Sequence, residues 1–179
     1  MIFTETKIKG VFVIEPEPIN DDRGFFACSW SRDEFARRGL NPRLAQCNIS
    51  FNHKRATLRG MHYQQAPHEE AKLVRCTSGL IFDVALDLRA HSPTRYQWVA
   101  TELGEKNRRM FYIPEGLAHG YQTLSDDTEI FYQISENYHP ESARGVRWDD
   151  PAFAIEWPLP PTIMADRDAN YPMMELAGG

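Results

Sequence analysis

Cysteine is scarce in this chain of 179 residues, and the spacing of the cysteines does not fit a CxxC metal site. The three cysteines, Cys28, Cys47 and Cys76, cannot all pair within one chain, and no two of them form the CxxC spacing typical of a metal site. Reduced thiols are the simplest account of these residues, and cytoplasmic proteins keep their thiols reduced. The sequence therefore predicts a cytoplasmic protein.

Long apolar runs and an excess of positive charge are also absent. No apolar stretch approaches the roughly 20 residues that span a bilayer, and residues 1–7 lack the basic and apolar segments of a secretory signal. The formal net charge of −5 argues against a general nucleic-acid or membrane binder. Any phosphate binding must be local, and we expect a soluble, intracellular protein with no nucleic-acid or membrane partner.

The chain does contain many short strand-like runs in an ordinary globular composition. Its 42% hydrophobic and 25% charged residues predict one domain over residues 1–179, with a substantial core. The expected strands span residues 11–14, 47–51, 58–64, 81–89, 97–103, 109–113 and 129–135. Short strands with turn residues between them, together with one or two short helices, favour an all-β sandwich or small barrel.

Local patterns predict four further features. Ser31 can cap a short helix that Gly39 ends. Alternating apolar residues along 81–89 are typical of a strand with one apolar face. Residues 20–24 are expected to form a turn. From about residue 140 the chain is rich in proline, and we expect an irregular C-terminal segment.

Half of a metal-binding motif is present and the other half is missing. Residues 114–119 fit the PxGxxH pattern, which is the second half of the cupin signature. The first half supplies an HxH pair, but the residue two positions after His62 is Gln64, and His53 is too distant to replace it. A catalytic metal usually has at least three protein ligands, and His62 and His119 supply only two. The sequence therefore predicts a cupin-like jelly roll, an antiparallel β-sandwich, that has no metal centre.

The stretch 57–64 combines an anion-binding residue with a base. Arg59 has the planar charged group that suits phosphate, and the His62 imidazole can take or give a proton near neutral pH. In a regular strand the two side chains would point to opposite faces, so a shared site requires a bend, for which Gly60 is the expected place. The alternative is a buried histidine beside a surface arginine.

Three more residues are candidates for proton transfer and charge stabilisation. Tyr132 could donate its phenol proton, or it could simply belong to the core. Lys72 could stabilise an oxyanion, or it could be a solvated lysine. Asp168 could orient His62, as carboxylates do for catalytic imidazoles, or it could be a surface carboxylate.

Taken in order, the motifs of the chain resemble those of the dTDP-4-dehydrorhamnose 3,5-epimerase family. The motifs that carry the resemblance are Asp22-Arg23-Gly24-Phe25-Phe26, Gln46-Cys47-Asn48-Ile49-Ser50, Leu58-Arg59-Gly60-Met61-His62-Tyr63-Gln64, Lys72-Leu73-Val74, Gly79-Leu80-Ile81-Phe82-Asp83-Val84, Ile113-Pro114-Glu115-Gly116-Leu117-Ala118-His119-Gly120, Tyr132, Tyr138, Trp148-Asp149-Asp150-Pro151 and Asp166-Arg167-Asp168. They cover residues 9–172, and as an ordered set they are highly specific.

The resemblance implies a homodimeric jelly roll that needs neither metal nor organic cofactor. Its substrate would be a nucleoside-diphosphate 4-keto-6-deoxy sugar, which it would epimerise at C3 and C5 through an enolate. By similarity His62 is the base, Asp168 its partner, Lys72 the residue that stabilises the enolate and Tyr132 the acid on the opposite face. The resemblance also implies a set of substrate-binding residues, namely Arg23, Phe26, Gln46, Asn48, Arg59, His119, Tyr138 and Arg167.

Three positions depart from the family pattern, and they concern the nucleotide. Cys28 and Ala143 stand where glutamate is common, and Arg167 stands where lysine is common. The proton-transfer residues are intact, so the sequence supports the reaction class more strongly than the identity of the base. The alternatives are an epimerase that inverts only C3 or only C5, a non-catalytic nucleotide-sugar binding protein, and a metal-dependent cupin.

Overall fold

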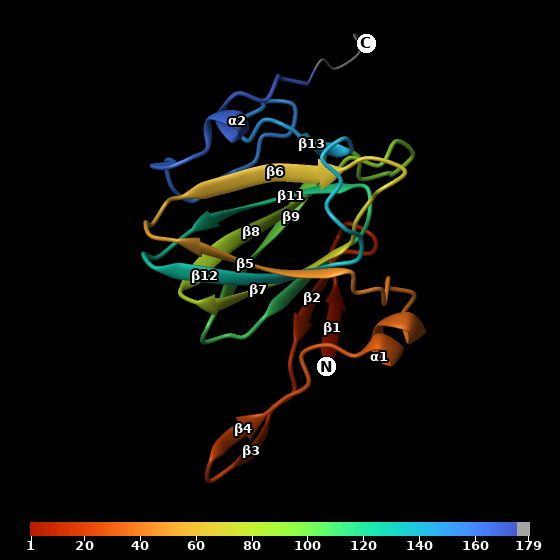
Figure 1. The fold of residues 1–179 in the computed structure, drawn as a ribbon, viewed down its shortest axis with the longest axis vertical. Helices are drawn as coiled ribbons and strands as arrows, with labels where there is room; N and C mark the ends of the chain where they lie inside the picture. Colours follow the sequence, from red (N-terminus) through yellow and green to blue (C-terminus); the bar gives the residue numbers. More distant parts are fainter. Residues whose placement is uncertain (175–179) are drawn as a thin grey trace.

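Two antiparallel β-sheets face each other in the computed structural model, which describes residues 1–174 (Figure 1). The six-stranded sheet has the order β1 (Ile2–Glu5), β2 (Phe12–Glu15), β10 (Met110–Ile113), β7 (Lys72–Ser78), β12 (Thr128–Ile134) and β5 (Gln46–Asn52). The five-stranded sheet has the order β13 (Ala143–Gly145), β6 (Leu58–Gln64), β11 (Leu117–Thr123), β8 (Leu80–Asp87) and β9 (Trp98–Gly104). The predicted all-β sandwich is confirmed.

The main core lies between these two sheets. Val74 and Phe111 from the six-stranded sheet pack with Ile81 and Ala85 from β8 of the other sheet, and all four are fully buried. Removing such side chains from water contributes roughly 1.5–3 kcal/mol for each large residue. This packing fixes the positions of the two sheets relative to each other. It therefore also fixes the side chains that the two sheets direct toward each other.

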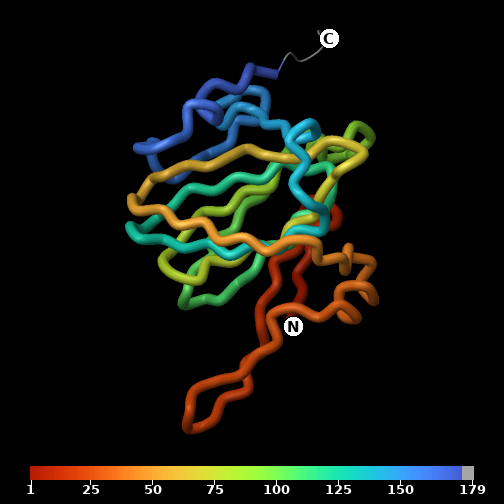
Figure 2. Tube along the Cα trace, viewed as in Figure 1, coloured from red at the N-terminus to blue at the C-terminus, as the bar shows by residue number. Residues whose placement is uncertain are grey.

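The prediction of a single apolar face on the strand at 81–89 is wrong, because both faces of β8 are buried. Val84 and Leu86 point away from the main core and pack under Phe153 and Trp157. Figure 2 shows the segment after β13, drawn in blue, lying against the five-stranded sheet on the side away from the six-stranded sheet. The expected irregular C-terminal segment thus covers a sheet face that would otherwise be in water.

Helices are few and short. Helix α1 spans Arg32–Arg37, and the Ser31 hydroxyl accepts a hydrogen bond from the Glu34 N–H at 3.4 Å. Gly39 follows the helix with a φ of +72°, so both predicted ends are confirmed. The other helix, α2, spans Asp166–Ala169. No helix in residues 1–174 is long and apolar enough to cross a bilayer.

A hairpin of two short strands extends away from the sandwich (Figure 1). Strand β3 (Ile19–Asp21) pairs with β4 (Gly24–Phe26), and the turn predicted at 20–24 joins them. The hairpin forms a two-stranded sheet of its own and pairs with neither large sheet. All residues of both strands are exposed, which leaves the aromatic side chains of β4 in contact with solvent.

Candidate active site

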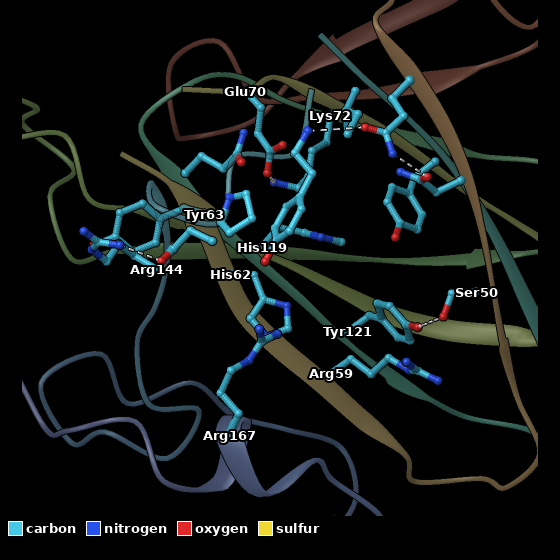
Figure 3. Close-up of a pocket in the computed structure, with 18 of the residues that line it drawn as sticks. Ser50, Arg59, His62, Tyr63, Glu70, Lys72, His119, Tyr121, Arg144 and Arg167 are labelled. Atoms are coloured by element: carbon cyan, nitrogen blue, oxygen red, sulfur yellow. Dashed lines mark hydrogen bonds and ion pairs between the residues drawn. The ribbon is translucent and has the colours of Figure 1, made fainter. Parts of the chain in front are cut away.

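A cavity of about 620 Å³ opens between the two sheets, within the range typical of ligand pockets (Figure 3). Strands β5, β7 and β12 line it from the six-stranded sheet, and β6 and β11 line it from the five-stranded sheet. The segment 138–144 and helix α2 complete the wall. Polar and charged side chains predominate, which suits a polar, charged ligand.

A bulge in β6 brings Arg59 and His62 into this cavity together. His119 pairs with His62 and Tyr121 pairs with Arg59, so the register between β6 and β11 shifts by one residue between these pairs. Gly60 lies in the shifted stretch with a φ of +140°, and a Cβ there would stand 2.5 Å from the Cα of Gly120. The predicted bend at Gly60 is confirmed, and only glycine fits the close approach.

His62 forms a hydrogen-bonded pair with Asp168. Its Nε2 lies 2.7 Å from Oδ1 of Asp168, while Oδ2 of Asp168 accepts the Gly60 backbone N–H at 3.2 Å. Burial raises the pKa of Asp168, but the hydrogen bonds and the Arg167 charge outweigh burial and leave that pKa below its ordinary value. Asp168 is therefore an ionised acceptor, so Nε2 carries a proton and Nδ1 is the basic nitrogen.

Arg167 places a positive charge beside this pair. Its Nη2 lies 3.5 Å from Nε2 of His62, and its Nε lies 3.5 Å from the Asp168 carboxylate. Figure 3 shows the Arg167 side chain reaching toward His62 from the helical segment below the cavity. The guanidinium is mostly exposed, so it can also meet an anionic ligand.

Lys72 lies buried at the start of β7 and forms an ion pair with Glu70. Both side chains line the cavity and both are about nine-tenths buried. A buried lysine keeps its charge only with such a partner, because an unpaired buried ammonium is strongly disfavoured. The pair supplies a fixed ammonium group whose charge can act on a bound ligand.

His119 forms a second histidine–aspartate pair with Asp83 in the cavity wall. Its Nε2 lies 2.7 Å from Oδ1 of Asp83, a carboxyl that is fully buried. Burial raises the pKa of Asp83, although the His119 contact works in the opposite direction. Among residues 1–174 nothing hydrogen-bonds to the other oxygen of Asp83. This pair holds the His119 ring in a fixed orientation.

Tyr132 enters the cavity from β12, opposite the strand that carries His62. Burial raises the pKa of Tyr132, with a smaller opposing effect from Arg59, so its phenol is protonated at neutral pH. The ring packs against the main core, where Ile130 lies, but the side chain also lines the cavity. Tyr132 therefore fits both interpretations made from the sequence, because its ring belongs to the core and its side chain also faces the cavity.

The structure brings ten of the twelve predicted site residues together. Nine line the cavity, namely Gln46, Asn48, Arg59, His62, Lys72, His119, Tyr132, Tyr138 and Arg167. Asp168 lies directly behind His62. Arg23 and Phe26 do not join them, because both lie on the β3–β4 hairpin, where Arg23 pairs with Asp21.

Sequence reasoning missed several lining residues. They are Ser50, Tyr63, Gln64, Glu70, Tyr121, Ile134, Pro140, Arg144 and Tyr171, whereas Ala143, which the sequence assigns to the nucleotide end, also lines the cavity. Alternation along β5 could have revealed Ser50, which shares a face with Gln46 and Asn48. The Glu70–Lys72 spacing could have suggested an ion pair. No sequence pattern points to Tyr171, which packs against Gly145.

Comparisons with known proteins agree with this arrangement. A family model described as dTDP-4-dehydrorhamnose 3,5-epimerase matches residues 5–175. The enzyme of that name from Methanothermobacter thermautotrophicus is 42% identical over 94% of this chain and 92% of its own length. A dTDP-4-dehydrorhamnose 3-epimerase from Streptomyces niveus is 40% identical over 91% of this chain and 79% of its own length.

A solved structure extends the likeness from sequence to fold. It is a dTDP-6-deoxy-D-glucose-3,5-epimerase from Legionella pneumophila, in complex with dTDP-4-keto-L-rhamnose. The two chains superpose with a TM-score of 0.91 at 37% identity, over 99% of this chain and 94% of the other. The match covers both sheets and the cavity between them.

Proposed function

The chain belongs to the dTDP-4-dehydrorhamnose 3,5-epimerase family, and we propose that it inverts C3 and C5 of a 4-keto-6-deoxy sugar on a nucleoside diphosphate, with dTDP as the expected carrier. It is an isomerase that acts on a carbohydrate. The reaction needs no external redox partner, because a proton is removed from carbon and a proton is returned.

One observation carries the proposal: the candidate base and the candidate acid face the same cavity from opposite sheets. His62 lies on β6 of the five-stranded sheet, and Tyr132 lies on β12 of the six-stranded sheet. Inverting a carbon centre requires a proton to leave from one side and return from the other. A sugar ring held between the sheets would meet His62 on one face and Tyr132 on the other.

The proton path follows from the atoms already described. The C4 carbonyl makes the neighbouring C–H groups acidic, because loss of either proton gives an enolate. Nδ1 of His62 takes the proton, and the ionised Asp168 stabilises the imidazolium that forms. The Lys72 ammonium stabilises the enolate oxygen. Tyr132 donates its phenol proton to the carbon from the other side, and solvent restores both groups.

Cationic and aromatic residues at the cavity suit the rest of the substrate. Arg59, Arg144 and Arg167 line it and offer planar charged groups to the diphosphate. Tyr138 is 56% exposed at the same cavity, so its ring is available to stack on a nucleoside base. Gln46 provides amide groups for further hydrogen bonds.

A homodimer would account for the two binding residues that lie far from the cavity. Arg23 and Phe26 lie on a hairpin that extends from the sandwich, and Phe26 is 72% exposed (Figure 1). Ile19 stands opposite Phe26 in the hairpin and is 70% exposed, so the two form an exposed apolar patch of the kind that marks an interaction surface. We propose that the hairpin reaches the cavity of a second copy and supplies both residues there.

The outer face of the six-stranded sheet supports the same assembly. Ile49 is directly opposite Phe131, and Phe131 is directly opposite Arg75, so the three form a row across β5, β12 and β7. Ile49 is 66% exposed. The Arg75 guanidinium lies 4.8 Å from the Phe131 ring, and within residues 1–174 its buried Nε has no hydrogen-bond partner. A second copy would cover this row.

The cytoplasm is the compartment we propose for the protein. Cys28, Cys47 and Cys76 are all free thiols, and two of them are exposed. Exposed free thiols persist in reducing compartments, which supports this location.

Deuterium incorporation tests the function directly. The enzyme is given dTDP-4-keto-6-deoxyglucose in D₂O, and NMR follows deuterium and configuration at C3 and C5, with the corresponding UDP sugar as a comparison. We expect deuterium and inversion at both carbons. No exchange at either carbon would refute an epimerase and would favour a protein that only binds nucleotide sugars.

A 3-epimerase is the second candidate, because one relative at 40% identity carries that name. The same experiment separates the two, since a 3-epimerase would give inversion at C3 alone. A clear preference for the UDP sugar would overturn dTDP as the carrier. The comparison matters because Cys28 and Ala143 depart from the family pattern at the nucleotide end.

A further inference from the structure

Two histidines and a glutamate meet at the rim of the cavity, outside the residues that line it. His68 and His139 stack with parallel rings, 3.6 Å between centroids and 6° between planes. Glu141 lies beside both, with Oε1 at 3.1 Å from Nδ1 of His139 and 3.9 Å from Nδ1 of His68. One ligand atom from each of the three residues lies within 4.8 Å of the other two.

These separations suit a tetrahedral metal ion. Zn–N and Zn–O bonds of about 2.0–2.1 Å at tetrahedral angles place neighbouring ligand atoms roughly 3.3–3.4 Å apart. The nitrogen–oxygen distances of 3.1 and 3.9 Å bracket that value. Parallel rings direct their in-plane lone pairs along parallel lines, so binding requires each imidazole to rotate until both point to one centre.

Two polar residues flank the histidines. The buried Ser142 hydroxyl lies 2.9 Å from Nδ1 of His68, the nitrogen that also faces Glu141, so this hydrogen bond gives way when a metal binds there. A Glu136 carboxylate oxygen lies 4.0 Å from Nε2 of His139, the nitrogen that faces away from Glu141. At 4.0 Å this contact is longer than the hydrogen bond that a ligating imidazole commonly donates to a carboxylate, but the negative charge beside the ring still favours a bound cation.

The backbone around the three residues is already held in place. Gln64 is buried, and its side-chain NH₂ donates to the carbonyls of His68 and Asn137, while its oxygen accepts the His139 N–H at 2.6 Å. One side chain thus ties both histidine-bearing segments together. A site whose backbone is fixed before the metal arrives loses less conformational entropy on binding.

We propose that His68, His139 and Glu141 bind one Zn²⁺ or a similar divalent transition metal per chain, with water in the fourth position. Imidazole nitrogens favour this class of metal over Mg²⁺ and Ca²⁺, which prefer oxygen ligands. The ion cross-links residues 65–71 to residues 136–142. Tyr138 and Pro140 line the cavity, so the metal fixes one part of its rim.

Calorimetric titration of the chelator-treated protein with ZnCl₂ tests the site. We expect one ion per chain with a dissociation constant on the order of 1–10 µM, weaker than that of four-ligand structural sites. His139→Ala and His68→Ala should each weaken binding at least about 100-fold, as loss of a ligand should exceed the effect of losing an outer-shell partner. Co²⁺ should give the visible absorption of tetrahedral coordination in the wild type and lose it in both variants.

Two control variants separate this site from the other histidines. His91→Ala removes an exposed histidine elsewhere and should leave binding unchanged. His62→Ala removes a cavity histidine and should also leave it unchanged. Hydrogen exchange of residues 136–142 should slow when Zn²⁺ is added to the wild type and not to His139→Ala.

Some results would overturn the proposal. They are wild-type binding weaker than about 100 µM, binding that survives in His139→Ala, and binding that His62→Ala abolishes. The last result would place the ion in the cavity instead. None of these readouts depends on turnover, so the site can fail while the epimerase function stands.

Discussion

At the scale of single residues, His62 and Tyr132 are proposed to act in the same reaction, and their variants should differ in the rates of deuterium exchange and of inversion. His62→Ala removes the base, so deuterium exchange and inversion should both fall by roughly 10²–10⁴-fold. Tyr132→Phe removes only the phenol proton, so exchange into the substrate should continue through His62 while inversion falls. NMR in D₂O measures both quantities on one sample. Equal loss of exchange and inversion in Tyr132→Phe would contradict separate roles, and dTDP affinity in each variant is the control.

Asp168 makes a further prediction at this scale, which concerns stability and pH. Its pKa is lower in the folded chain, because the His62 hydrogen bond and the Arg167 charge outweigh burial. A carboxyl with a lowered pKa stabilises the fold above its unfolded pKa of about 4, and this contribution is lost as pH falls through the folded value.

Asp168→Asn should therefore destabilise the protein most at pH 6–8, and the difference from wild type should shrink below about pH 4. Urea unfolding at several pH values measures it. Asp126→Asn is a suitable control, because that carboxylate is exposed and its nearest cation, Lys54, is 4.0 Å away. A pH-independent difference for Asp168→Asn would show that packing rather than charge is responsible.

At the scale of elements, the bulge in β6 is what places Arg59 and His62 in the same cavity. Gly60→Ala adds a Cβ 2.5 Å from the Gly120 Cα at a φ of +140°, and we expect a loss of roughly 2–5 kcal/mol from strain and overpacking. Gly24→Ala is the matched control: its φ is +127° but nothing lies within 4 Å of the new Cβ, so about 1–2 kcal/mol is expected. Urea unfolding measures both, and equal losses would mean that the close approach does not matter.

The sequence revealed some strands and not others for a physical reason. Strand β6 was predicted with its observed bounds, and Gly60 was predicted as its bend, since glycine marks such positions. Strand β11 was missed, because all seven of its residues are buried and no alternation appears. It contains His119 and Gly120, which serve the cavity and the close contact with β6. Strand β7 begins at Lys72, a buried charge that periodicity does not anticipate.

At the scale of the whole molecule, the cavity joins residues from position 46 to position 171. No local pattern could reveal that set, because the sandwich brings distant segments together; the ordered family motifs identified most of it. The contact of His62 with Asp168 spans 106 positions, and the motif order favoured it over the alternative of a surface carboxylate. Arg23 and Phe26 lie outside the cavity of their own chain, so the proposed homodimer decides whether they bind substrate.

Mixing two inactive variants tests that assembly. If the hairpin acts in the partner's cavity, an Arg23→Ala chain keeps an intact His62 and can receive Arg23 from a His62→Ala chain. Random pairing makes half of the dimers mixed, each with one complete cavity, so co-refolded variants should recover about a quarter of wild-type activity. If Arg23 acts within its own chain, every cavity in the mixture lacks one residue and no activity returns. Light scattering on the same samples measures the mass, and a monomer would refute the proposal before the assay is run.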